Sequence, residues 1–283
     1  MIGNWALGIG VGGLVAWLGW RSALLSRGGA VSLGACIVIT FLAGGWAWGG
    51  LSVLSVITIG LWARFRQGYK RTLGERFHRG AQQGWIQVLA RVGWATTLAI
   101  LYGLVAEERG ILVGFVGALA ASTADAWGTE LGVLSNQMPR TIISPRRLPA
   151  GEPGGITLLG IVAGLGASWL LGFAGLLFNA IKSWIAQITL DPVLLWLPIA
   201  AMLGGMAGSL TDSLLGAAAQ GIYYCEHCKE RSEYRLHTCG RRTEQVRGWA
   251  WLTNEGINMV CTLVGAAITA GAVSWLARFG AGW

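Results

Sequence analysis

Residues 28–63 read GGAVSLGACIVITFLAGGWAWGGLSVLSVITIGLWA and contain no charged side chain. The run is long enough to cross the hydrocarbon core of a bilayer nearly twice as an α-helix, since one crossing takes about 20 residues. Its middle, residues 44–50, combines glycine with tryptophan, which is typical of a tight turn. We therefore expect two transmembrane helices here, joined by a turn on the outer side of the membrane.

The rest of the chain has the same apolar character. Of its 283 residues, 54% are hydrophobic and only 12% are charged, and the mean hydropathy is +0.56. Ionisable groups are thus too scarce to coat a soluble protein of this size. The first apolar run has no Lys or Arg before it and no small-residue cleavage site after it, so we expect a retained span and no cleaved signal peptide.

The sequence predicts an all-α fold, a polytopic transmembrane helix bundle that forms a single domain over residues 1–283. About eight spans are expected, at residues 3–20, 28–48, 49–63, 85–106, 110–135, 156–181, 192–220 and 249–277. Glycines four residues apart are expected to let neighbouring helices approach closely, as at Gly8 and Gly12, Gly160 and Gly164, and Gly204 and Gly208.

This layout places most of the 21 basic residues on one side of the membrane. They include the group between the third and fourth spans, namely Arg64, Arg66, Lys70, Arg71, Arg76 and Arg79. The positive-inside rule assigns that side to the cytoplasm and both termini to the other side. We expect a bacterial inner or thylakoid-type membrane. The net charge of +8 is explained by this topology, and no nucleic-acid partner is expected.

Five charged residues are predicted inside the membrane, in the cytoplasmic halves of their spans: Arg91, Asp125, Glu130, Asp212 and Glu255. A charge at this depth costs several kcal/mol, so such residues usually serve a function. Polar residues three or four positions apart share a helix face, as in the pairs Gln87 and Arg91, Ser122 and Asp125, Ser209 and Asp212, and Asn254 and Asn258. The structural alternative is that these groups only form hydrogen bonds between helices.

Two spans carry a similar short pattern. Residues 121–125 read ASTAD and residues 208–212 read GSLTD, so both give a small residue, Ser and, three residues later, Asp. Such duplication is common where two helices supply matching ligands to one site.

Carboxylates, hydroxyls and amides are the hard oxygen ligands that Mg²⁺ takes when substrate phosphates complete its coordination shell. A proton or sodium pathway uses similar groups, so an ion- or proton-coupled transporter or flippase of a lipid phosphate is the alternative. A transporter predicts polar groups that continue into the outer halves of the spans, and those halves are nearly free of ionisable residues. A non-catalytic scaffold leaves the buried carboxylates unexplained.

The cytoplasmic loop at residues 144–157 reads SPRRLPAGEPGGIT and precedes a helix. Arginines, a flexible glycine turn and a hydroxyl at a helix N-terminus can hold phosphates through backbone N–H groups and the helix dipole. By itself, a Gly/Pro loop between spans is more often only a connection. The candidate phosphate-binding residues are Arg146, Arg147, Gly151, Gly154, Gly155 and Thr157.

The last cytoplasmic loop, residues 221–248, contains four residues suited to tetrahedral zinc: Cys225, Cys228, His237 and Cys239. In a reducing compartment disulfides are not expected. A zinc ion here would be structural and would fold a loop too short to have its own core. Cys36 and Cys261 lie inside spans and are expected to be small apolar fillers.

These motifs together resemble an integral-membrane family that includes the phytyl-phosphate kinases of tocopherol (vitamin E) synthesis. The resemblance covers nearly the whole chain and is carried by QVLA at 87–90, ADAWGTELG at 124–132, the loop 147–157, GSLTDSLLGA at 208–217 with Gln220, and Asn254 with Asn258. Ala126 and Glu152 stand where the family usually has Thr. A carboxylate at Glu152 would repel a phosphate unless a metal or an arginine intervened.

The resemblance implies phosphoryl transfer from a nucleoside triphosphate to phytyl monophosphate or a related prenyl monophosphate. CTP is the donor that we expect first. The isoprenoid tail would stay in lipid while its phosphate meets the nucleotide at the cytoplasmic surface. Asp125, Glu130 and Asp212 are then expected to hold Mg²⁺, with Arg91 in the catalytic group. Substrates would be bound and oriented by Gln87, Ser122, Ser209, Ser213, Asn254, Asn258 and the loop residues named above. Glu255 joins this group by depth alone, as a potential structural partner for Arg91, and a homo-oligomer is left open.

Overall fold

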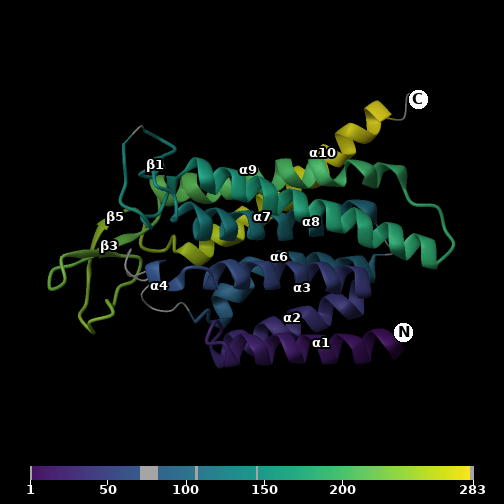
Figure 1. Cartoon of the computed structure of the whole chain (residues 1–283), viewed down its shortest axis with the longest axis horizontal. Helices are drawn as coiled ribbons and strands as arrows, with labels where there is room; N and C mark the ends of the chain where they lie inside the picture. The colour runs from purple at the N-terminus through teal and green to yellow at the C-terminus, as the bar shows by residue number, and fades with distance from the viewer. Residues whose placement is uncertain (1, 71–81, 106–107, 145, 281–283) are drawn as a thin grey trace.

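The computed structural model describes residues 2–70, 82–105, 108–144 and 146–280. In these ranges, eight helices of 18 to 28 residues form a bundle (Figure 1). They are α1 (Ile2–Arg21), α2 (Arg27–Gly44), α3 (Trp46–Arg64), α6 (Trp85–Leu104), α7 (Arg109–Gly132), α8 (Leu158–Ile185), α9 (Leu197–Ala218) and α10 (Asn254–Gly280). By length and composition, seven of these described helices, α2, α3 and α6 to α10, can cross a membrane.

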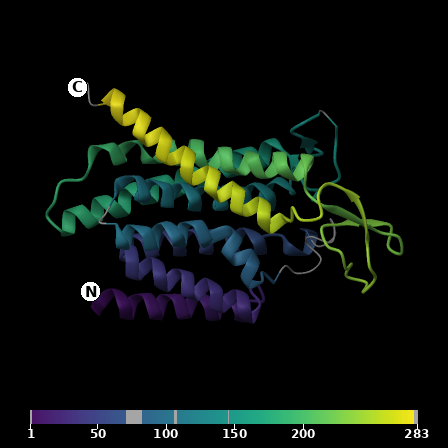
Figure 2. The same ribbon diagram turned by 180° about the vertical axis from the view of Figure 1, so that it is seen from behind.

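Consecutive long helices run in opposite directions, so both termini lie at the same end of the bundle (Figures 1 and 2). Two short helical segments also lie within the described residues, α4 (Gln67–Lys70) and η2 (Pro192–Trp196). The polytopic helical fold is therefore confirmed. The expected turn at residues 44–50 is shorter than predicted: Gly45 alone separates α2 from α3, because its φ of 78° reverses the chain in one residue.

Basic residues mark the end of the bundle opposite the termini. Arg21, Arg27 and Arg64 lie at helix ends there, with Arg66 and Lys70 just beyond. Arg71, Arg76 and Arg79, predicted on the same side, lie outside the described residues. Applied to this arrangement, the positive-inside rule predicts that this end faces the cytoplasm.

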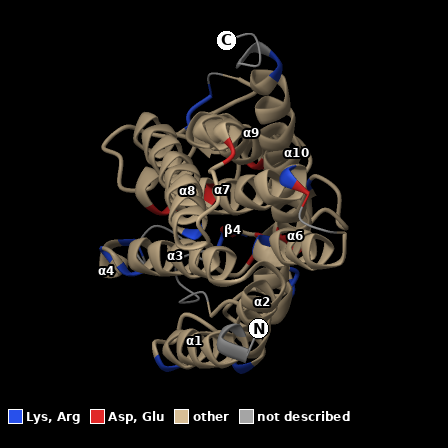
Figure 3. Ribbon diagram, turned by 90° about the vertical axis from the view of Figure 1, so that its right-hand side faces the viewer, with Lys and Arg blue, Asp and Glu red and all other residues tan. Residues whose placement is uncertain are grey.

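Helix α7 lies at the centre of the bundle, surrounded by α3, α6, α8, α9 and α10 (Figure 3). Its middle is fully buried, with Phe115 against Trp48 at a ring-centroid distance of 4.3 Å. Asp125, which is 4% exposed, is consequently enclosed by protein.

The predicted glycine pairs do mark close helix contacts. The distance from a Cβ added at each glycine to the facing helix is below 3.0 Å at five of the six positions and 3.4 Å at Gly164. Gly8 and Gly12 face α2, Gly160 and Gly164 face α7, and Gly204 and Gly208 face α10. Small residues thus set the spacing between these neighbouring helices.

Short strands form in the loops at the basic end of the bundle (Figure 1). Strands β1 (Arg140–Thr141) and β2 (Gly155–Ile156) pair antiparallel. Strands β3 (Ile222–Cys225), β4 (Glu230–Ser232) and β5 (Glu244–Arg247) form an antiparallel sheet in the order β4-β3-β5. The sequence did not indicate this small sheet, which contains the first of the predicted zinc ligands.

Candidate functional site

A pocket opens between α7, α8 and α9 at the basic end of the bundle. It is lined by residues of these three helices and of the glycine-rich loop. Eight of the predicted site residues line it: Asp125, Gly151, Gly154, Gly155, Thr157, Ser209, Asp212 and Ser213. Spans and loop that are distant in the sequence therefore form one site.

The two repeated motifs meet where α7 and α9 cross. A Cβ added at Gly208 would lie 2.7 Å from the Cβ of Ala121 and 2.6 Å from the carbonyl oxygen of Cys261 on α10. These two small residues are the first residues of the patterns ASTAD and GSLTD. Because α7 and α9 run in the same direction, Asp125 and Asp212 follow this contact by about one turn each. The duplication thus places two carboxylates on one pocket.

The glycine-rich loop is fixed against the end of α9. Gly154 has a φ of 81°, and a Cβ added to it would lie 2.5 Å from the backbone nitrogen of Ala217. Thr157 then caps α8, accepting a hydrogen bond from Gly160 N at 3.1 Å and donating one to Gly132 O at 3.2 Å. The N-terminus of α8 therefore faces the pocket with its positive dipole end.

Glu152 also lines the pocket, at a position where the family that the motifs resemble was expected to have Thr. Its side chain is 9% exposed, and its Oε1 pairs with Nη1 of Arg231 from β4. From β5, Arg247 donates through Nη2 to the carbonyl oxygen of Gly216 at 2.9 Å. The Cys/His loop thus contributes two arginines beside the pocket that sequence reasoning missed, because they looked like ordinary topological charges.

A second set of polar contacts links α6 to α7 and to α10. Arg91 Nη2 is 3.7 Å from Asp125 Oδ2, and Gln87 Nε2 donates to Glu255 Oε1 at 3.3 Å. The partner of Glu255 is therefore Gln87, whereas Arg91 pairs with Asp125. Asn258 donates to its own helix at Asn254 O, at 3.0 Å.

Several predicted site residues do not line the pocket. Besides Gln87, Arg91, Asn254 and Asn258, these are Ser122, which is 1% exposed on α7, and Arg146 and Arg147, which are exposed in the loop between β1 and β2. Of the residues on α6 and α10, Arg91 reaches the pocket residue Asp125. The two loop arginines lie farther out on the pocket's own loop.

Glu130 is the clearest departure from the expected carboxylate group. It lies five residues after Asp125, a rotation of about 140° around the helix axis. Its Oε2 accepts from Lys70 Nζ at 2.6 Å, and Lys70, only 1% exposed, also donates to Trp62 O at 2.7 Å. Glu130 is thus held away from the pocket by a cation that the sequence placed in a solvated loop.

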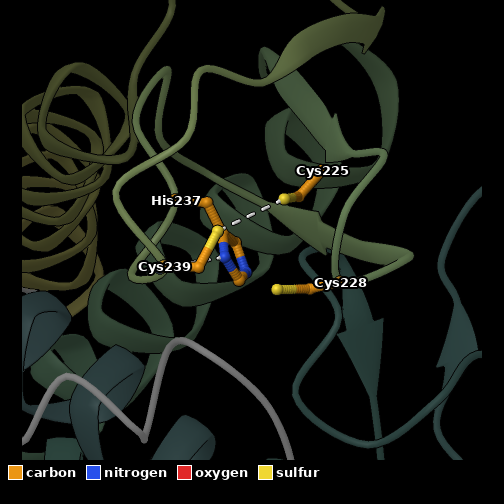
Figure 4. Close-up of side chains that lie close together, drawn as sticks. All are labelled: Cys225, Cys228, His237 and Cys239. Atoms are coloured by element: carbon orange, nitrogen blue, oxygen red, sulfur yellow. Dashed lines mark hydrogen bonds between the residues drawn. The ribbon is translucent and has the colours of Figure 1, made fainter.

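The four predicted zinc ligands converge in the Cys/His loop (Figure 4). The ligand atoms of Cys225, Cys228, His237 and Cys239 all lie within 4.8 Å of one another, and the sulfurs of Cys225 and Cys239 are 3.7 Å apart. Tetrahedral zinc with Zn–S bonds of about 2.3 Å needs sulfurs about 3.8 Å apart. These residues therefore fit zinc.

Hydrogen bonding in the Cys/His loop also favours a thiolate. A backbone hydrogen bond at Arg241 lowers the pKa of Cys239 to about 7. Desolvation and the neighbouring thiols raise the pKa of Cys228 to about 11. Cys36 and Cys261 are buried among helices, as expected for fillers.

These features define a polytopic helical membrane protein with an acidic, glycine-lined pocket at one end of its bundle. The chain belongs to the integral membrane protein family DUF92, which it matches over residues 10–266. The family membership inferred from the motifs is thereby confirmed.

The chain is similar in sequence to proteins from three organisms. Protein PGR of Arabidopsis thaliana is 28% identical over 272 residues, 92% of each chain. An uncharacterized membrane protein of Methanocaldococcus jannaschii is 37% identical over 119 residues, 41% of this chain and 44% of its own. Another, of Synechocystis sp., is 24% identical over 249 residues, 83% of this chain and 77% of its own. No solved structure matches the chain.

Proposed function

We propose that this protein is a membrane-embedded isoprenoid-phosphate kinase. It would transfer a phosphoryl group from a nucleoside triphosphate, with CTP as the implied donor, to phytyl monophosphate, giving phytyl diphosphate for tocopherol synthesis. The observation that carries the proposal is the pocket in which Asp125 and Asp212 face the glycine-rich loop and the N-terminus of α8.

The charge of the pocket argues for a cation between protein and phosphate. Asp125, Glu152 and Asp212 all line it, and three carboxylates repel a phosphate unless positive charge intervenes. Mg²⁺ is usually bound by one or two carboxylates, with phosphates and water completing its shell. Asp125 and Asp212 are the proposed ligands, and the hydroxyls of Ser209 and Ser213 lie beside them.

The oxygen donor set fits Mg²⁺ as a cofactor shared with substrate. Among the described residues, the only assembled group of three or more metal-ligating side chains is the Cys/His group. Two aspartates can supply only part of an octahedral shell, and substrate phosphates and water would complete it. When bound, the ion would neutralise charge on the phosphates.

The chain's own residues then position the reactants. An oxygen of the acceptor phosphate attacks the γ-phosphorus, the bond to the β–γ bridging oxygen breaks, and the nucleoside diphosphate leaves. The acceptor is already anionic near neutral pH, so positioning and charge neutralisation do most of the work and no general base is required. Arg91, 3.7 Å from Asp125, orients that carboxylate from behind.

The position of the pocket suits one lipid and one soluble substrate. It lies at the basic end of the bundle, where α7 and α9 end and α8 begins. The prenyl tail can remain in the bilayer while its phosphate enters the pocket, and the nucleotide arrives from water.

The direct test uses the purified protein in lipid nanodiscs with phytyl or farnesyl phosphate and each nucleoside triphosphate, with and without Mg²⁺. Formation of prenyl diphosphate only when Mg²⁺ is present supports the proposal. Absence of diphosphate with every pair, together with gradient-dependent movement of prenyl phosphate across proteoliposomes, would establish the transporter alternative.

A further inference from the structure

Two arginines of the Cys/His loop lie on the two outer strands of its small sheet. Arg231 on β4 is opposite Tyr224, and Arg247 on β5 is opposite Ile222. The pairing of β3 with β5 is irregular between Ile222 and Tyr223, so the position of each arginine is given by the contacts that its side chain makes.

Both arginines contact the wall of the pocket. Arg231 pairs with Glu152 of the glycine-rich loop, and Arg247 donates to Gly216 O near the end of α9. Gly216 itself touches the loop, because a Cβ added there would lie 3.1 Å from Gly154 N. The views in Figures 1 and 2 agree that the strands lie beside this loop.

The side chain of Arg247 is partly buried beside other charged groups. Desolvation lowers the pKa of Arg247, Glu152 opposes this, and the like charges of Arg231 and Arg146 lower it further. Nε of Arg247 is buried and has no hydrogen-bond acceptor among the residues that the structure describes. Arg231 and Arg247 thus both have Glu152 as a charged neighbour, an arrangement that suits an additional anion.

We infer that the polyphosphate chain of the donor nucleotide binds between the glycine-rich loop and the Cys/His sheet, where Arg231 and Arg247 donate to it. In the absence of ligand, Glu152 forms an ion pair with Arg231, and the phosphates then displace Glu152 from that arginine. This inference rests on the proposed function, since it names the donor side of the same pocket. The Cys/His loop, and zinc where bound, would then support nucleotide binding.

The location favours the donor over the lipid acceptor. Arg231 and Arg247 belong to strands between α9 and α10, outside the long helices, where a soluble nucleotide has free access. A phosphate anchored by a prenyl tail is restricted to the ends of those helices. Arg-to-phosphate hydrogen bonds are charge-assisted and can be bidentate, so each arginine should contribute measurably to affinity.

The experiment measures equilibrium binding of inorganic tripolyphosphate, CTP and phytyl phosphate, with Mg²⁺ and without a second substrate. Arg231→Gln and Arg247→Gln are compared with Arg242→Gln, an exposed arginine of the same loop. Loss of one charge-assisted contact should weaken binding of tripolyphosphate and CTP about 10-fold or more. Arg242→Gln should bind as the wild type does.

A fourth variant separates competition from a merely structural role. Glu152→Gln removes the internal competitor for Arg231, so tripolyphosphate should bind several-fold more tightly. If Glu152 only holds Arg231 in position, Glu152→Gln should weaken the binding of tripolyphosphate instead. That result would overturn the inference. So would wild-type affinity for tripolyphosphate in both arginine variants, or a loss confined to phytyl phosphate.

The outcomes also separate this inference from the proposed function. Arginine-dependent binding of tripolyphosphate without any phosphoryl transfer would refute the kinase proposal and retain the site. Normal diphosphate formation with unchanged binding in the arginine variants would retain the kinase and refute the site.

Discussion

Ala121 of α7 and Gly208 of α9 are in direct contact, and an added Cβ on Gly208 would lie 2.7 Å from the Cβ of Ala121. Each residue precedes a pocket aspartate by four positions, Asp125 in one helix and Asp212 in the other. The distance between the two carboxylates is therefore set by a helix contact about one turn away, deep in the bundle.

The first prediction concerns this helix contact. Gly208→Ala forces α7, α9 and α10 apart, because its Cβ would meet Cys261 O at 2.6 Å as well as Ala121. Overpacking of this kind typically costs about 1–3 kcal/mol, so the midpoint of thermal unfolding in detergent should fall. Gly166→Ala on α8 is the control, since nothing lies within 4 Å of its Cβ. Equal unfolding midpoints for the two variants would contradict the role of the contact.

The second prediction concerns the pair of Lys70 and Glu130. Lys70→Met leaves Glu130 without its 2.6 Å partner, and breaking a fully buried ion pair costs about 3–5 kcal/mol. Because Glu130 is 22% exposed, we expect a smaller loss, about 2 kcal/mol, measured as a lower unfolding midpoint.

The double variant Lys70→Met/Glu130→Gln should recover part of that loss, since no charge is left unpaired. Glu130→Gln alone should retain the Mg²⁺ dependence of any prenyl-phosphate kinase activity. If Glu130→Gln needed a Mg²⁺ concentration 10-fold or more higher for the same activity, Glu130 would have to be a metal ligand.

The third prediction concerns zinc in the Cys/His loop. The purified protein should contain one zinc ion per chain, measured by elemental analysis, since one group of four ligand atoms converges there. Cys225→Ser should lose the metal, whereas Cys36→Ala, in the buried part of α2, should keep it. Stripping zinc with a chelator should expose the loop to trypsin at its arginines. A metal-free protein whose loop resists trypsin would show that the sheet folds without zinc.

The membrane fold could be predicted from the sequence because its signals are local. An uncharged run such as residues 28–63 has few alternatives to two membrane helices, and glycines four residues apart predict close contacts on a known helix face. The carboxylates Asp125 and Asp212 could likewise be paired, because their motifs repeat in two spans of the same direction.

The remaining features depend on contacts between distant segments. Nothing near Lys70 in the sequence shows that it folds back under α3 to reach Glu130, 60 residues later. Arg231 and Arg247 resemble other basic loop residues until a three-stranded sheet turns both toward Glu152 and α9. Glu130 was grouped with Asp125 by depth, yet helix geometry turns it to another face.

The most direct test of the central claim compares three Asp→Asn variants in the Mg²⁺-dependent phosphorylation of phytyl phosphate. Asp125→Asn and Asp212→Asn change the proposed Mg²⁺ ligands, whereas Asp191→Asn, paired with Arg109 at the opposite end of the bundle, is a matched control. With all three folded, we predict a loss of about 100-fold or more in kcat/KM for the first two and wild-type activity for the control. Wild-type activity in Asp125→Asn and Asp212→Asn would contradict the account.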